Sequence, residues 1–158
     1  MLDVEELRNF LIKAKKKGYA AGSDVKAASD VMVTKDENGT TIYFSQGDWR
    51  YEDNYCGGEP FGGTERVFYK GKQVWRMSYH GRVLDPSDKE VVYPFLKRML
   101  SFIMPEKPFR GPGLYLVGDM HYNNTSVGDI EDFFGNEKIL ICGREIYRAV
   151  YIGGVVDI

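Results

Sequence analysis

The segment at residues 61–85 recurs without a gap at residues 133–157. The two copies read FGGTERVFYKGKQVWRMSYHGRVLD and FFGNEKILICGREIYRAVYIGGVVD. Matching positions carry Gly63 and Gly135, Glu65 and Glu137, Arg76 and Arg148, and Tyr79 and Tyr151. The similarity extends upstream and predicts repeats at 42–85 and 114–157. Two copies are too few for a solenoid, so the pattern favours one internally duplicated, pseudo-two-fold domain.

Each copy has the pattern of a β-hairpin. Two apolar runs flank a short turn, Lys70-Gly71 or Cys142-Gly143, where glycine supplies the positive φ that a tight turn needs. Pairing outward from these turns predicts a cross-strand ion pair in each hairpin. The opposed residues would be Val67 and Val74, Glu65 and Arg76, Ile139 and Ile146, and Glu137 and Arg148.

A helical pattern precedes each repeat. Amphipathic spacing predicts helices at 4–17 and 89–104. Short strands are expected before the first hairpin, and polar or glycine-rich segments at 52–63 and 123–133 indicate loops. The predicted fold is therefore a single α+β domain over 1–158, an antiparallel β-sheet of hairpins with both helices packed on one face.

Charge and hydropathy exclude several classes of protein. The net charge is −2 and the pI is about 5.7, which lacks the basic excess of a general nucleic-acid binder. The basic cluster at 13–17 is expected to be a solvated helix end. A charged N-terminal segment and the lack of any run of roughly 18 apolar residues predict a soluble, cytoplasmic protein that does not bind membranes.

Aromatic side chains and two glutamates are the candidate ligand-binding residues. Aromatic residues make up 14% of the chain, and several flank a glycine-rich segment where a backbone can approach a ligand closely. A carboxylate among aromatic rings suits a small organic cation. An ordinary aromatic core with structural ion pairs explains the same residues and stays open. The candidate set is Trp49, Tyr51, Tyr55, Glu65, Trp75, Tyr79, Glu137 and Tyr151.

Other reactive side chains carry no diagnostic spacing. His80 and His121 are not at matching positions of the two repeats, and no metal-binding motif surrounds them. Cys56 has no local signature of a nucleophile. Arg110 could bind an anion, but it is expected to be solvated or bonded to a carbonyl group. We therefore predict no metal and no cofactor.

Several spaced motifs resemble one known family. Residues 47–65 read GDWRYxDxYxGGxxFxGxE, and 74–81 read VWxMxYxG. Further on, RGP at 110–112, GDI at 128–130, FxGxE at 133–137 and YxGG at 151–154 are similar to the same family, which is catalogued as domain of unknown function 5680. Its members occur alone or attached to helix-turn-helix regulators of the XRE type, which implies a sensory or ligand-binding role. The resemblance brings no activity, and Cys56 stands where an aromatic residue is expected.

The function predicted from these observations is small-molecule binding of the sensor or effector type. The ligand would lie in an acidic, aromatic cleft between the two repeats. One alternative is a hydrolase or isomerase that uses glutamate and histidine in acid–base chemistry. Another is a structural or interaction module with an apolar outer patch or a homodimer interface.

Overall fold

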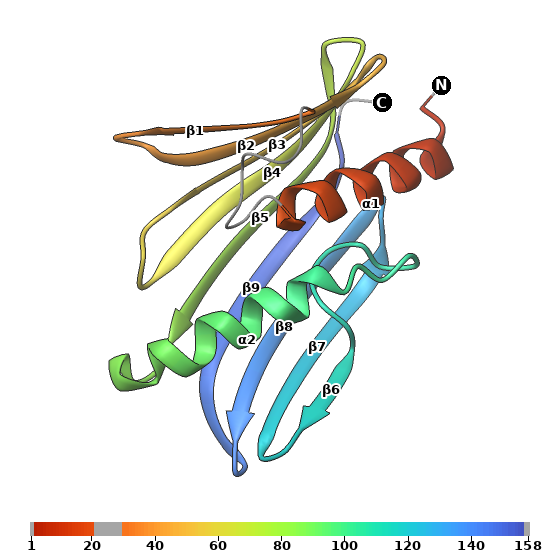
Figure 1. Cartoon of the computed structure of the whole chain (residues 1–158). Helices are drawn as coiled ribbons and strands as arrows, with labels where there is room; N and C mark the ends of the chain where they lie inside the picture. Colours follow the sequence, from red (N-terminus) through yellow and green to blue (C-terminus); the bar gives the residue numbers. More distant parts are fainter. Residues whose placement is uncertain (1, 21–29, 157–158) are drawn as a thin grey trace.

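One antiparallel sheet and two helices on the same face of it make up the fold (Figure 1). The computed structural model describes residues 2–20 and 30–156. In chain order the elements are α1 (Val4–Ala20), β1 (Val31–Asp36), β2 (Gly39–Gln46), β3 (Trp49–Cys56), β4 (Phe61–Tyr69), β5 (Lys72–Val83), η1 (Pro86–Asp88), α2 (Lys89–Ser101), β6 (Leu114–Val117), β7 (Met120–Asp129), β8 (Asp132–Ile141) and β9 (Arg144–Val155). The strand order is β1-β2-β3-β4-β5-β9-β8-β7-β6, so β5 and β9 pair at the middle.

Both helices bury the stripes that the sequence predicts. Residues of α1 pack on the half of the sheet made by β2 to β5, and those of α2 pack on the half made by β7 to β9. Asp3 caps α1, because its Oδ1 accepts from the amides of Glu5 at 2.9 Å and Glu6 at 3.1 Å. The expected ends differ slightly, since α1 continues to Ala20 and α2 stops at Ser101. Within the described residues, no helix has the length and apolar character needed to cross a membrane.

Much of the two segments expected as loops is strand. β3 extends to Cys56 and β7 covers Met120–Asp129. Turns at residues 47–48 and 118–119, where both glycines have a positive φ, precede these strands, and the loops within the two predicted segments are limited to residues 57–60 and 130–131. Polar residues misled the prediction because Asp53 and Asn124 face the helices and accept hydrogen bonds there.

A β-bulge in each hairpin makes the predicted register wrong. The turn at Lys70-Gly71 forms as expected, with φ of 50° and 81°. The pairing then shifts between Val67 and Phe68, so that Val67 faces Trp75 and Glu65 faces Met77. An extra residue in one strand rotates the following side chains relative to the partner strand.

The second hairpin shifts in the same way between Ile139 and Leu140, which puts Ile139 opposite Tyr147 and Glu137 opposite Ala149. Both glutamates consequently face the helices, whereas Arg76 and Arg148 are exposed. The two cross-strand ion pairs predicted from the sequence therefore do not form. We call the covered side of the sheet the helix face and the opposite side the outer face.

Candidate functional site

Five ionisable side chains are buried together on the helix face: Lys15, Asp53, Glu65, Arg110 and Glu137. We call them the buried charge cluster. Lys15 comes from α1, three carboxylates come from β3, β4 and β8, and Arg110 comes from the segment between α2 and β6. Burying an ion costs several kcal/mol even after relaxation, so the concentration of five such groups in one layer makes it the candidate site.

Lys15 and Glu65 form an ion pair with no exposure on either side chain. Lys15 Nζ lies 2.9 Å from Glu65 Oε2 and also donates to the carbonyl oxygen of Phe109. Among the described residues, Glu65 Oε1 has no hydrogen-bond partner. Burial lowers the pKa of Lys15, and the charge of Glu65 opposes that change. The expectation that the basic cluster at 13–17 is wholly solvated is therefore wrong at Lys15.

Asp53 lies directly opposite Glu65 in the ladder between β3 and β4. The hydroxyl of Tyr79 donates to Asp53 Oδ1 at 2.7 Å. Burial raises the pKa of Asp53 to about 7, and the neighbouring charge of Glu65 acts in the same direction. The helix face thus holds a carboxyl group that exchanges its proton near neutral pH.

Glu137 accepts hydrogen bonds from three residues. Arg110 Nε donates to Glu137 Oε1 at 3.1 Å, and Arg110 Nη2 also contacts that oxygen. The hydroxyls of Tyr122 and Tyr147 donate at 2.6 and 2.8 Å. Burial, together with the charge of Glu137, raises the pKa of both tyrosines. The expectation of a solvated or carbonyl-bonded Arg110 is wrong, because its side chain is buried against this carboxylate.

Arg110 also connects the two acidic centres. Its guanidinium carbon lies 5.2 Å from the centre of the Tyr79 ring, and that tyrosine donates to Asp53. A cation over an aromatic face is favourable, more so where water is excluded. The five ionisable groups therefore form one connected cluster.

The predicted aromatic residues all belong to the helix face. Tyr51, Trp75, Tyr79 and Tyr151 are in the core, and Trp49 and Tyr55 pack against it partly buried. Trp75 Nε1 donates to the Ile130 carbonyl at 3.0 Å. The Tyr151 hydroxyl donates to Asn124 Oδ1 at 2.7 Å, and burial raises the pKa of Tyr151 to about 12. Of the predicted residues, Glu65 and Glu137 belong to the charge cluster, and Tyr79 contacts it through its hydrogen bond to Asp53.

Sequence reasoning missed Lys15, Asp53, Tyr122 and Tyr147 as members of the site. For Lys15 a signal was present, because it continues the i, i+4 series of Leu7 and Leu11 on the buried stripe of α1. For Asp53 the signal was its position along β3, because it lies two residues from Tyr51 and from Tyr55 and therefore shares their inward face. Arg110 lies in a segment without periodicity, and nothing in the sequence marks its burial.

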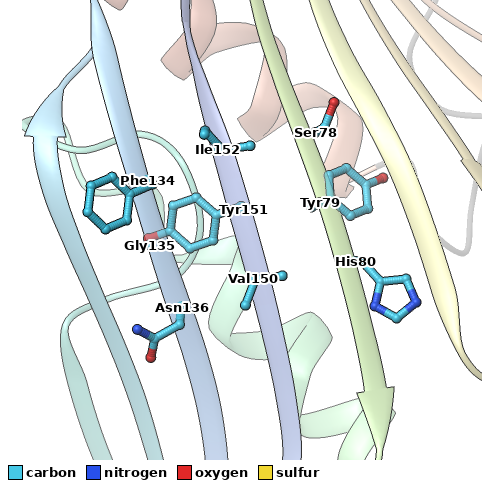
Figure 2. Close-up of a pocket in the computed structure, with 9 residues that line it drawn as sticks. All are labelled: Ser78, Tyr79, His80, Phe134, Gly135, Asn136, Val150, Tyr151 and Ile152. Carbon is cyan, nitrogen blue, oxygen red and sulfur yellow. The ribbon is translucent and has the colours of Figure 1, made fainter.

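The outer face carries a shallow depression of about 470 Å³ between β5, β8 and β9 (Figure 2). Its lining includes Ser78, His80, Phe134, Asn136, Val150 and Ile152. His80 therefore points away from the charge cluster, and so does His121, whose neighbour Tyr122 faces inward. Within residues 2–20 and 30–156, no group of three or more His, Cys, Asp or Glu side chains is placed to hold a metal ion.

The family model described as Domain of unknown function (DUF5680) matches residues 53–156. No curated protein and no solved structure matches the chain. The matched range includes every member of the buried charge cluster except Lys15.

Proposed function

Because the chain belongs to the DUF5680 family, a domain family without an assigned activity, we propose its function from the buried charge cluster: it binds a small organic cation as a sensor-type domain. Glu65 carries the proposal. Its carboxylate is fully buried, one oxygen is ion-paired with Lys15, and the other has no hydrogen-bond partner among the described residues. A buried acceptor left without a donor costs about 1–3 kcal/mol, which an N–H group of a ligand would recover.

The energetics of buried charges support a role beyond stability. Replacing a buried ion pair by apolar side chains of similar volume is often neutral or stabilising. A core that served only to hold the fold together would gain little from Lys15, Asp53 and Glu65 in one place. Groups whose pKa is shifted by burial and by a specific charge partner are enriched at functional sites, and Asp53 and Lys15 both meet that description.

Lys15 indicates the chemistry of the ligand. Its ammonium group lies against Glu65, in the layer that Tyr79 and the aromatic core enclose. A ligand ammonium or guanidinium would take the same position after the lysine side chain withdraws. The aromatic rings would then contribute cation–π and apolar contacts. The ligand is therefore an amine or guanidine with an apolar body.

Titration with alkyl- and arylammonium compounds tests the proposal. The only tryptophans, Trp49 and Trp75, both face α1 and the core, so their fluorescence reports on this layer, and calorimetry gives the affinity. We expect an amine to bind and the alcohol of the same shape not to bind. Glu65→Gln should weaken binding tenfold or more, about 1.4 kcal/mol, whereas Lys15→Met should strengthen it by removing the internal competitor.

Glu145→Gln is the matched control, because Glu145 is a surface carboxylate that pairs with Arg148 at 2.8 Å. It should leave amine affinity unchanged. If no amine changes the fluorescence or releases heat, or if Glu65→Gln binds as tightly as the wild type, the proposal is wrong.

A hydrolase or isomerase is the second candidate, and Asp53 favours it. A group with a pKa of about 7 suits general acid–base catalysis at neutral pH. The chemistry would use Asp53 with Tyr79, because both histidines lie on the outer face. Turnover of a bound amine that is lost in Asp53→Asn while binding persists would identify an enzyme. Binding without turnover would select the sensor.

We also infer that the two halves arose by duplication. Phe61 pairs with Gly81 and Gly63 with Tyr79 in the first hairpin. The second hairpin repeats these pairs as Phe133 with Gly153 and Gly135 with Tyr151. Both hairpins carry a bulge at the matching position, and Tyr79 faces Tyr151 where β5 pairs with β9. A pseudo-two-fold axis between these tyrosines would put the charge cluster where the halves meet.

A sensor of this kind would act in the cytoplasm, either alone or beside an XRE-type helix-turn-helix region. With a net charge of −2, the domain itself would bind its small ligand and leave contact with nucleic acid to such a region.

A further inference from the structure

Exposed apolar side chains lie on the outer face of β7, β8 and β9, where neither helix covers the sheet (Figure 1). Figure 2 shows Phe134, Val150 and Ile152 among them. Val127, Phe134 and Ile152 lie directly opposite one another across the three strands. Val150 is the next outer-face residue of β9. Their exposed fractions are 57% to 62%. We call these four residues the outer apolar patch. A contiguous exposed patch with a polar surround is typical of an interaction surface.

Charges of opposite sign flank this patch along the strands. On one side, Lys138 of β8 lies opposite Arg148 of β9, and we call this pair the basic end. Like charges directly opposed in a ladder repel each other. Glu145 contacts both cations, at 3.3 and 2.8 Å. Because this single carboxylate offsets only one of the two positive charges, the basic end keeps a net positive charge.

On the other side of the patch, Asp132 of β8 lies opposite Asp129 of β7. We call this pair the acidic end. Along β8 the acidic Asp132 and the basic Lys138 share the outer face, with Phe134 and Asn136 between them. The patch therefore has an anionic margin and a cationic margin on the same strand.

We propose that this surface is a symmetric interface with a second copy of the chain. The two-fold axis would lie in the plane of the interface, run perpendicular to the strands and cross β8 near Gly135. Rotation about this axis places the basic end of each subunit over the acidic end of the other. The two apolar patches then meet between the charged ends. An isologous interface requires such self-complementarity. A partner of a single charge sign would match one end of the surface and be repelled by the other.

The arginines of β5 limit the overlap of the two subunits. Arg76 and Arg82 lie at opposite ends of the outer face of β5, so an interface that included β5 would bring like charges together. The contact is therefore confined to β7, β8 and β9. Three strands about 4.8 Å apart and about 33 Å long cover roughly 500 Å² per subunit. This is below the roughly 800 Å² per partner of a standard interface, so we expect a weak dimer.

Sedimentation velocity of the full chain over a range of concentrations tests the proposal. We expect reversible monomer–dimer exchange, with a dissociation constant between about 1 μM and 1 mM, that weakens with added salt. Phe134→Glu should abolish the dimer, because it buries a charge in the centre of the interface. Phe134 is exposed, so circular dichroism should show an unchanged fold. Met32→Glu is the matched control, because Met32 is equally exposed but lies on β1 at the edge of the sheet.

A charge exchange tests the geometry itself. Lys138→Glu alone and Asp132→Lys alone should each weaken association at least tenfold, because each opposes like charges across the interface. An equimolar mixture of the two variants should associate as a heterodimer, and the double variant should recover the homodimer.

A chain that stays monomeric at about 1 mM would overturn the proposal. So would a dimer that Phe134→Glu leaves intact, or single charge variants whose mixture does not associate. None of these outcomes depends on Glu65 or on amine binding, so the dimer and the proposed function can fail separately.

Discussion

Gly63 lies directly opposite Tyr79, and the tyrosine ring crosses over the glycine to reach Asp53 on the next strand. A Cβ atom at position 63 would overlap the tyrosine hydroxyl, would lie 2.5 Å from its Cζ, and would lie 2.7 Å from the Asn54 carbonyl oxygen. Only glycine therefore permits the hydrogen bond between Tyr79 and Asp53 across β4. Gly135 and Tyr151 repeat this arrangement toward Asn124.

Replacing this glycine should displace the Tyr79 ring. We expect Gly63→Ala to lower the free energy of unfolding by about 2–3 kcal/mol, from overpacking and from the loss of a buried hydrogen bond. Urea denaturation measures the change. Gly58→Ala is the matched control, since a Cβ at position 58 meets no atom within 4 Å, and it should change stability by less than about 0.5 kcal/mol. Equal effects at the two positions would contradict this account.

Removing the Lys15 ammonium should leave Glu65 buried without a counter-ion. We expect Lys15→Met to destabilise the fold by about 3–5 kcal/mol. Adding Glu65→Gln to Lys15→Met should recover much of that loss, because the unpaired charge is gone. Lys17→Met provides the comparison, since Lys17 pairs with Asp30 at 3.1 Å on the surface. This substitution should lower the free energy of unfolding by less than about 1 kcal/mol. An equally mild effect of Lys15→Met would show that the pair is not desolvated.

The two tyrosines that donate to Glu137 should have non-additive effects on the free energy of unfolding. Tyr122→Phe and Tyr147→Phe each remove one buried donor, which should cost about 1–2 kcal/mol. Because both donate to one carboxylate that Arg110 also contacts, the double variant should depart from the sum of the single ones. Tyr43→Phe, on the outer face beside Glu52, is the control with little expected effect. Strict additivity would contradict a shared acceptor.

Local sequence signals predicted the parts of the fold that depend on near neighbours. The stripes of α1 and α2 and the turn at Lys70-Gly71 each need only a few consecutive residues. The resemblance of the motifs to DUF5680 was confirmed, since the family model matches residues 53–156.

Long-range contacts account for what the sequence did not predict. The bulge at Val67 can be understood only with the burial of Glu65, whose partner Lys15 is far away in the chain. Arg110 reaches Glu137 from a segment without a periodic pattern. Asp53 and Asn124 looked like loop residues because buried polar groups in strands are rare, and their donors, Tyr79 and Tyr151, come from other hairpin strands.

Asp53 should give stability a characteristic dependence on pH. Its pKa is about 7 in the folded state and 3.8 in its ordinary environment, so folding favours the protonated carboxyl group. This contribution is complete below pH 4 and is lost as the pH rises to about 7. The loss is on the order of 4 kcal/mol, from 1.36 kcal/mol per pKa unit.

Urea denaturation between pH 4 and pH 8 checks this expectation. Asp53→Asn should flatten the decline, so that wild type and variant differ most in slope between pH 4 and pH 7. Asp85→Asn supplies a contrast of opposite sign, because hydrogen bonds from Ser87 lower the pKa of the exposed Asp85. The stability that Asp85 contributes is lost only as the pH falls below its ordinary pKa of 3.8, so Asp85→Asn should leave the decline between pH 4 and pH 7 unchanged. A wild-type decline that survives unchanged in Asp53→Asn would assign it to another group.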